Sequence, residues 1–329
     1  TLSGTNTYTG ATQVTGGATL AISSNANLGA PATGAALTLN NGSLRADASV
    51  ALENTSTTNF RAITLGAGGG TLNVAGANAL TVRGVISGAG NLTKNGTGNL
   101  LLFGANTYTG GFTRIQDGSI QITSTGAITS STLVVLGNGT TSGKLILGDS
   151  VGVKSQTVAG LLTSGTGTAN AVVGGNAANS TLTYTGTVGI PTTYSGTLGG
   201  AGANENNLAL SVTAGILTLN GANTFTGGTT VSGGVLNINS ASAIGSGTLT
   251  VTGGTIDNTS AGALTFSGNN ALALNGNLTF GVTQSLNVGT GTTTMAASRT
   301  ITLLGDAANT NSLTLPNFNI TAADRKSVV

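Results

Sequence analysis

The chain has 329 residues, of which 38% are hydrophobic and only 5% are charged, and its formal net charge is +2. Disordered chains combine low hydrophobicity with high net charge, so this composition excludes a disordered tail, and it differs from an average soluble domain, where about 25% of residues are charged. A charge imbalance this small creates no field that attracts nucleic acid or an anionic membrane, and no nucleic-acid partner is expected.

Short segments that alternate apolar and polar residues follow one another along the chain. Alternation with period two predicts half-buried β-strands, and the separating Gly and Asn residues tolerate the positive φ of tight turns. The 55 glycines come with only 3 prolines, and no window has the apolar stripe of a helix. In chain order, the clearest predicted strands lie within residues 36–46, 70–76, 98–104, 143–149, 215–221, 247–258 and 271–280. Leu145 and Leu217 are predicted to face inward, and Thr218 outward.

An internal repeat divides the chain. Residues 2–22, 102–122 and 219–238 align with one another, the last with one deletion. A repeat of this kind predicts a single continuous solenoid. The first residues of the repeats divide it into three predicted modules, residues 1–101, 102–218 and 219–329.

Two all-β architectures fit short strands at this spacing. A parallel β-helix of about 20 to 25 residues per coil needs only a thin interior of stacked Leu, Ile, Val and Ala side chains. Tandem β-sandwiches are the alternative, but they need wide cores that usually contain large aromatics, and here aromatics are 3% and Trp is absent. The composition therefore favours the β-helix.

Each repeat contains an eight-residue corner with an aromatic at one fixed place: GTNTYTGA at 4–11, GANTYTGG at 104–111 and GANTFTGG at 221–228. Copies this far apart cannot touch, so each is expected to do the same local job. We predict that the glycines turn the chain, that the Asn bonds to nearby backbone as Asn does in turns, and that the aromatic packs against the adjacent coil. An exposed aromatic that contacts a glycan is the alternative. The positions are Asn6, Asn106 and Asn223, and Tyr8, Tyr108 and Phe225.

Residue types that carry chemistry are scarce. His and Cys are absent, which removes the commonest proton shuttle and the thiol nucleophile. Coiling can bring two carboxylates together, as β-helical polysaccharide lyases and hydrolases do, but no two lie closer than six residues in sequence. We therefore predict no catalytic, cofactor-binding or metal-binding residues and no cofactor. The carboxylates are Asp47, Glu53, Asp117, Asp149, Glu205, Asp257, Asp306 and Asp324. The GAGGG at 66–70 lacks a following GK[ST] and is predicted to be a turn rather than a phosphate loop.

Residues 88–122 resemble the autotransporter-associated β-strand repeat, in which a strand like L-T-K-x-G-x-G-x-L-x-L leads into G-x-N-T-Y-T-G-G-T and a G-x-L-x-I strand. The similarity extends to residues 215–238, and to 2–22 without the leading strand. The resemblance implies a right-handed parallel β-helix in a secreted or surface-exposed bacterial protein that acts as stalk, adhesin or passenger.

We therefore expect a non-enzymatic structural protein of the bacterial cell surface or extracellular space. A glycan-binding adhesin and a glycan-active β-helix enzyme are the alternatives, so surface glycans are possible partners. No apolar run reaches the ~18 residues of a membrane span, so no membrane insertion is expected. Self-association is also expected: residues 311–320 are strand-like and would complete a coil of another copy, head to tail, unless the solenoid continues in a longer chain.

Overall fold

The computed structural model describes residues 1–29, 36–53, 60–187, 190–295, 297–305, 310–316 and 318–321. The described residues are almost entirely strand and turn, with a single 3-10 helix, η1 (Asn25–Leu28). The chain forms two compact units, Thr1–Val158 with Thr163–Ala171, and Ala159–Leu162 with Val172–Val329. Within the described residues, no helix is long and apolar enough to cross a membrane.

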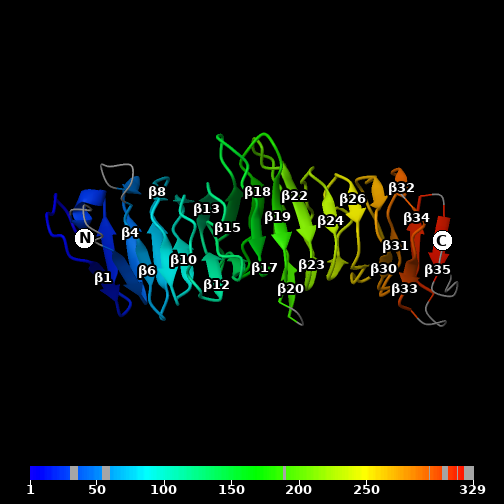
Figure 1. Ribbon diagram of the computed structural model, residues 1–329, viewed down its shortest axis with the longest axis horizontal. Helices are drawn as coiled ribbons and strands as arrows, with labels where there is room; N and C mark the ends of the chain where they lie inside the picture. Colours follow the sequence, from blue (N-terminus) through cyan, green and yellow to red (C-terminus); the bar gives the residue numbers. More distant parts are fainter. Residues whose placement is uncertain are drawn as a thin grey trace. The chain divides into compact units, whose positions relative to one another are not determined.

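The first unit consists of coils that add strands in turn to parallel sheets (Figure 1). The first sheet has the order β1 (Thr12–Thr15), β3 (Leu37–Asn40), β6 (Ile63–Leu65) and β9 (Ile86–Gly88). The second contains β2 (Thr19–Ile22), β4 (Gly42–Ala46), β7 (Gly70–Val74), β10 (Leu92–Asn95), β12 (Phe112–Ile115) and β14 (Leu133–Leu136). The third contains β5 (Val50–Leu52), β8 (Ala79–Val82), β11 (Asn99–Leu102), β13 (Gly118–Ile122) and β15 (Gly143–Leu147). The strand β16 (Gln156–Val158) follows in the chain.

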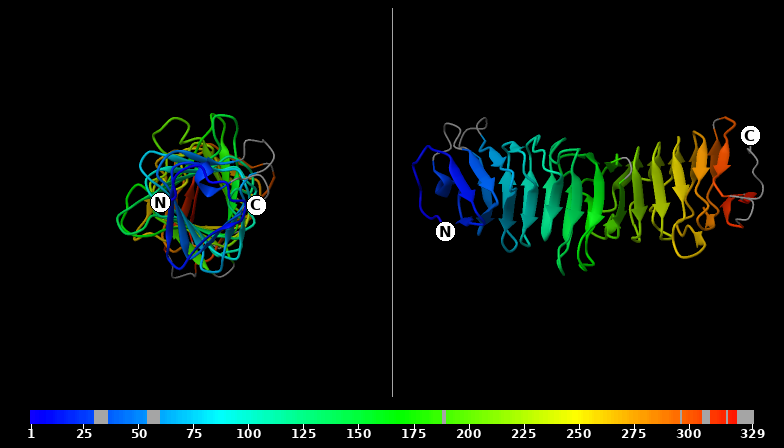
Figure 2. Two further views of the ribbon diagram at one scale, coloured as in Figure 1. Left: turned by 90° about the vertical axis from the view of Figure 1, so that its left-hand side faces the viewer. Right: turned by 90° about the horizontal axis from the view of Figure 1, so that it is seen from below.

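The second unit repeats this arrangement, and its successive strands lie side by side in Figure 1 and in the right-hand view of Figure 2. One sheet contains β19 (Ser180–Tyr184), β22 (Leu208–Val212), β24 (Thr229–Val231), β26 (Leu249–Val251), β29 (Leu272–Leu274) and β32 (Thr293–Met295). The next contains β20 (Pro191–Tyr194), β23 (Ile216–Leu219), β25 (Val235–Ile238), β27 (Thr255–Asp257), β30 (Leu278–Phe280) and β33 (Ile301–Leu303). A third contains β28 (Leu264–Thr265), β31 (Leu286–Asn287), β34 (Ser312–Leu315) and β35 (Phe318–Thr321). The remaining strands are β17 (Gly160–Thr163), β18 (Ala171–Gly174) and β21 (Thr197–Leu198).

The core of each unit is a set of inward rows of side chains in register from coil to coil. In the first unit one such row joins positions 44, 72, 94, 115 and 136. In the second unit one row joins positions 217, 236, 256 and 280. Successive positions in these rows are separated by close to the predicted coil length of about 20 to 25 residues. The predicted all-β parallel β-helix is confirmed, and the alternative of tandem β-sandwiches is excluded.

Alternation along most of the predicted strands places every second residue in this core. The strands β7, β15 and β22 each alternate buried and partly exposed residues over five positions. Leu145 and Leu217 have no exposed surface, whereas Thr218 is partly exposed, as predicted. Each of the seven segments predicted from alternation contains a strand.

The strand-like segment near the C-terminus has a partner in its own chain. β35 pairs antiparallel with β34, with Ser312 opposite Thr321 and Leu315 opposite Phe318. Part of the segment 311–320, which was expected to complete a coil of another copy, therefore pairs with a strand of its own chain. The two compact units reflect spatial contacts, whereas the three modules are sequence repeats, so the module boundaries remain predictions.

Candidate functional site

The repeat corners carry the strongest sequence signal, and two of them turn their aromatic residue inward. Tyr108 and Phe225 have no exposed surface, and Tyr8 is 38% exposed. The predicted packing of the aromatic against an adjacent coil is therefore confirmed in the second and third repeats, where no aromatic at this place is available to stack on a glycan.

A buried threonine accompanies each of these two aromatics. The Tyr108 hydroxyl lies 2.6 Å from Thr113 Oγ1, and burial raises the pKa of Tyr108. In the third repeat the aromatic has no hydroxyl, and the buried Thr229 donates its Oγ1 hydrogen to the carbonyl of Ile244 at 3.2 Å. The one-residue deletion of the third repeat lies between the aromatic and this threonine, so the threonine stays on the inward face.

The corner asparagines tie three successive coils together. Asn106 Oδ1 accepts a hydrogen bond from the backbone N–H of Ile86 at 2.7 Å, and Asn106 Nδ2 donates to the carbonyl of Ala127 at 2.5 Å. These partners lie 20 residues before and 21 residues after the asparagine. The expectation that Asn106 bonds to nearby backbone, as in a turn, was wrong. The corner replaces part of a strand, so its side chain satisfies backbone groups that a strand ladder would otherwise pair.

The third repeat repeats this bridge. Asn223 Oδ1 accepts from the N–H of Leu198 at 2.8 Å, and Nδ2 donates to the carbonyl of Ala243 at 2.5 Å. Both asparagines are buried. Backbone pairing continues beside them, because Thr107 N–H donates to the carbonyl of Ile86 at 2.9 Å. The corner is therefore a coil-stacking device.

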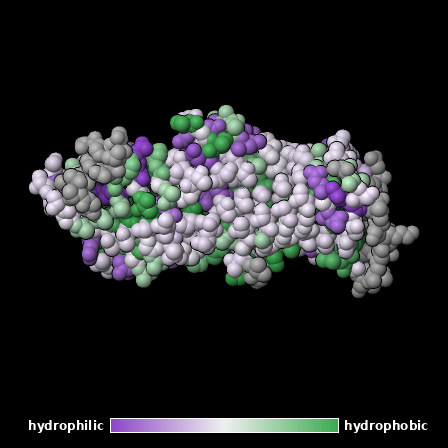
Figure 3. Space-filling view, in the orientation of Figure 1, coloured by the Kyte–Doolittle hydropathy of each residue, from purple (hydrophilic) through white to green (hydrophobic). Residues whose placement is uncertain are grey.

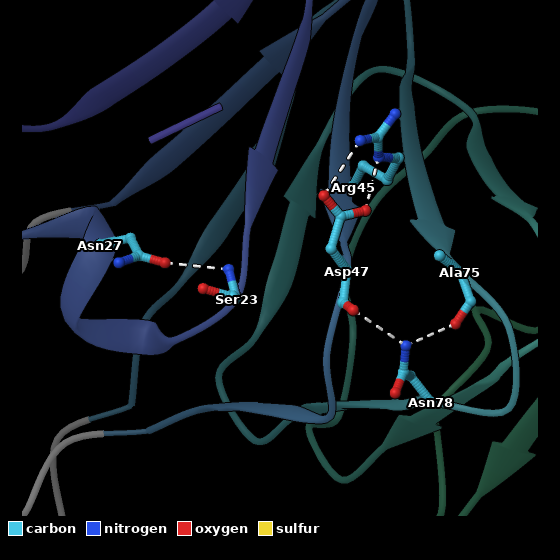
Figure 4. A network of polar contacts seen from close by, with 6 residues as sticks. All are labelled: Ser23, Asn27, Arg45, Asp47, Ala75 and Asn78. Atoms are coloured by element: carbon cyan, nitrogen blue, oxygen red, sulfur yellow. Dashed lines mark hydrogen bonds and ion pairs between the residues drawn. The ribbon is translucent and has the colours of Figure 1, made fainter. Parts of the chain in front are cut away.

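The first repeat uses the same asparagine differently. Asn6 Nδ2 donates to the carbonyl of Asn27 at 2.7 Å, and Asn27 Nδ2 donates to the carbonyl of Gly4 at 2.8 Å. Asn27 Oδ1 also accepts from the N–H group of Ser23 at 2.9 Å (Figure 4). The same oxygen accepts from the N–H group of Ser24 at 2.9 Å, which caps η1.

A lysine that sequence reasoning missed lies inside the first unit. Lys94 has no exposed surface, and its inward position on β10 lies in register with Leu72 and Ile115. Its ammonium donates to the carbonyls of Asn95, Gly96 and Asp117 at 3.0, 2.6 and 3.1 Å. The signal was present in the sequence, since Lys94 is two residues after the inward Leu92 on an alternating strand.

Lys94 makes the stability of the first unit depend on pH. Burial lowers the pKa of Lys94 to about 8, against a smaller opposing effect of the Asp117 charge. Between pH 8 and the ordinary lysine pKa, the unfolded chain binds this proton more strongly than the folded chain does, so stability rises with pH. The free energy of unfolding of the wild type, minus that of Lys94→Met, is expected to rise by about 2 kcal/mol from pH 8 to pH 10, at up to ~1.4 kcal/mol per unit.

This difference is measured by denaturant unfolding of both proteins at each pH. Burial raises the pKa of Tyr108, Tyr184 and Tyr194, which lowers stability above about pH 10 in both proteins and cancels in the difference. Leu92→Met, at the preceding inward position, should give a flat difference. If the free-energy difference between the wild type and Lys94→Met also stayed constant from pH 8 to pH 10, the three carbonyls would be keeping the ammonium charged.

The described carboxylates have partners of their own. Asp47 pairs with Arg45 at 2.7 Å, close to Asn78, whose Nδ2 donates to the carbonyls of Asp47 and Ala75 (Figure 4). Glu53 pairs with Arg83 at 2.6 Å.

Four other carboxylates accept hydrogen bonds from nearby groups. Asp257 accepts from the N–H and hydroxyl of Thr283 at 3.0 and 2.6 Å. Three more accept from backbone N–H groups one to three residues away in tight turns: Asp117, Asp149 and Glu205. In the part of the chain that the structure describes, no cluster of three acidic residues could hold a metal ion. Asp306 and Asp324 lie outside the described residues.

The glycine cluster at 66–70 forms a turn beside a groove. Gly69 has φ +75°, its N–H donates to the carbonyl of Gly66 at 2.8 Å, and the N–H of Gly68 donates to Asn40 Oδ1 at 2.8 Å. The predicted turn is confirmed. The groove beside it has a volume of about 310 Å³. Its lining includes Gly17, Asn41, Ser43, Gly68, Gly69, Thr71, Asn91, Thr93 and Arg114.

A second groove lies beside the second repeat corner. It has a volume of about 380 Å³ and is lined by residues of three coils, 106–109, 125–126 with 128–131, and 155–157, with no charged side chain among them. The face of the molecule drawn in Figure 3 is mostly of intermediate hydropathy, which agrees with a chain in which only 5% of the residues are charged.

Comparison with known proteins identifies the repeat. The family model of the passenger-associated-transport-repeat matches residues 1–22, 92–122 and 214–238, which contain the three corners. The chain thus contains three copies of this repeat, and it is similar to autotransporter passenger proteins. The resemblance drawn from the sequence is confirmed, and the repeat's leading strand in the second match includes the buried Lys94.

One curated relative extends this result. The adhesin BmaC autotransporter of Brucella suis biovar 1 (strain 1330) is 41% identical over 111 residues, which is 33% of this chain and 3% of that protein. The chain thus aligns with a small part of a much longer relative. No solved structure matches the chain.

Proposed function

We propose that this passenger repeat chain is a structural, non-enzymatic segment of a bacterial cell-surface adhesin, in which stacked coils form a stalk. The observation that carries the proposal is the inward use of the repeat. Asn106 and Asn223 bond to the coils on either side, and Tyr108 and Phe225 are buried, so the repeated residues serve coil stacking. The matched relative is itself named as an adhesin.

The partners of the described carboxylates support a non-enzymatic role. A glycan-active enzyme of the usual kind needs two carboxylates that flank one bond. Here the described carboxylates hold arginines, a threonine and turn N–H groups, each in its own place along the coils. These contacts give each carboxylate a local structural task.

Surface exposure tests the proposal. An antiserum raised against the purified chain should label intact cells of the source bacterium, and protease added to intact cells should remove the label. Labelling only after lysis would overturn the surface location. Reproducible cleavage of a polysaccharide by the purified chain, lost on substitution of one carboxylate, would overturn the structural role.

Head-to-tail self-association and continuation in a longer chain remain proposals. Continuation in a longer chain is supported by the matched adhesin, because the aligned segment is only 3% of that protein's length. Electron microscopy of native material separates them: regular filaments built of short subunits support self-association, and long single fibres of one polypeptide support continuation.

A further inference from the structure

The 310 Å³ groove of the first unit follows one outward row of side chains across four strands. Ser43, Thr71, Thr93 and Arg114 are register partners on β4, β7, β10 and β12. Neighbouring strands lie about 4.8 Å apart, so the row presents three hydroxyls and one guanidinium over about 14 Å. This length suits a few consecutive sugar rings rather than a single small ion.

Glycines keep this row accessible. Gly17, Gly68 and Gly69 line the groove and carry no side chain that would cover the hydroxyls. Gly17 and Gly69 have φ of +80° and +75°, a region that favours glycine. The turn that the sequence singled out at 66–70 therefore leaves the groove open.

Arg114 is held in place but carries no ion pair among the described residues. Its guanidinium carbon lies 4.4 Å from the centre of the Phe112 ring. Arg83 stacks in the same way on Phe103 at 4.1 Å, but it pairs with Glu53. A guanidinium fixed on an aromatic face and left with its donors for another group is suited to a carboxylate or sulfate.

The rest of the lining offers hydrogen bonds and no opposing charge. Asn91 Oδ1 accepts from the N–H of Phe112 at 2.9 Å, which turns its amide nitrogen to other acceptors. No Asp or Glu lines the groove, and Arg114 is its one cation among the described residues. A polyanion such as nucleic acid needs many cations, whereas a saccharide with one acidic group per few rings needs one cation and several hydroxyl partners.

We propose that this groove binds an acidic saccharide, with the anionic group on Arg114 and the sugar hydroxyls on Ser43, Thr71 and Thr93. The proposal deepens the proposed adhesin function, on which it rests, and it names the ligand class. The groove at the second repeat corner offers an internal contrast, because no cation lines it in the part of the chain that the structure describes, so nothing there would prefer an acidic ligand.

Calorimetric titration of the purified chain tests the proposal with three tetrasaccharides at low salt. They are galactotetraose with a single galacturonate in place of one galactose, galactotetraose with a single sulfate, and neutral galactotetraose. The carboxylated or the sulfated probe should bind at least about tenfold more tightly than neutral galactotetraose, the difference expected of one charge-assisted bidentate contact. The comparison of the two acidic probes assigns the anion.

Variants locate the site. Arg114→Gln should weaken the acidic probe about tenfold, Arg114→Lys should weaken it less, and Thr71→Val should weaken it several-fold. Arg83→Gln is the matched control, a stacked arginine outside the groove, and should leave binding unchanged. Equal affinity of wild type and Arg114→Gln, preference for galactotetraose, or no binding of either acidic probe would overturn the proposal. Surface labelling of intact cells would survive each of these outcomes, so failure of the groove is distinct from failure of the adhesin role.

Discussion

Asn106→Ala is expected to lower the free energy of unfolding of the first unit by about 2 to 5 kcal/mol, since each buried polar group left without a partner costs about 1 to 3 kcal/mol. The substitution leaves the N–H of Ile86 and the carbonyl of Ala127, which lie in the coils on either side, without the hydrogen bonds that Asn106 makes to them. Asn106 is 7% exposed, so its amide is largely shielded from water and the two backbone groups lose most of their hydrogen bonding.

Denaturant unfolding together with hydrogen exchange of the Ile86 amide measures this loss. Asn106→Asp should not rescue it, because the carboxylate keeps an acceptor for Ile86 but faces the carbonyl of Ala127 without a donor. Asn6→Ala is the matched control, since Asn6 is only partly buried and, among the described residues, its side chain donates one hydrogen bond, to the carbonyl of Asn27. Its loss should cost about 1 kcal/mol. Equal losses at Asn6 and Asn106 would show that the bridge between coils adds nothing.

The fold followed from the sequence because period-two alternation fixes which face of a strand is buried. Alternation alone places Leu145 and Leu217 inside, and the scarcity of aromatics and Trp separates a thin solenoid interior from a wide sandwich core. The burial of Tyr108 and Phe225 followed from their recurrence at distances that forbid mutual contact. These inferences depend only on local pattern.

The asparagine bridges between coils and the groove beside Arg114 could not be predicted from the sequence, because both depend on which residues lie next to each other on neighbouring coils. The partners of Asn106 are 20 and 21 residues away in the sequence. Coil length varies along the chain, so a sequence pattern cannot align a side chain with its partners on the neighbouring coils. The same holds for the row from Ser43 to Arg114. Lys94 was missed for a different reason: a lysine is rarely buried, and that expectation concealed its inward place on an alternating strand.

Leu217→Ala should destabilise the second unit by about 2 to 5 kcal/mol, the cost of removing a buried leucine and leaving a cavity. Leu217 has no exposed surface and lies in register with Thr192 on one side and Leu236 on the other. Each coil of the thin interior supplies few side chains per row, so the neighbours cannot close the gap without shifting the parallel backbone ladder. The loss should therefore fall toward the upper part of this range.

Thr218→Ala is the matched control, one residue further on the same strand but on the outward face. Thr218 Oγ1 accepts a hydrogen bond from Asn237 Nδ2 at 3.1 Å on a partly exposed surface, so its loss should cost about 1 kcal/mol or less. Thermal and denaturant unfolding of both variants against the wild type give the two values. The strand, the coil and the solvent conditions are the same for both variants. The difference between their losses of unfolding free energy therefore measures the effect of facing the core rather than the solvent. Similar losses at both positions would mean that backbone pairing between coils, rather than the row of aliphatic side chains, holds the second unit together.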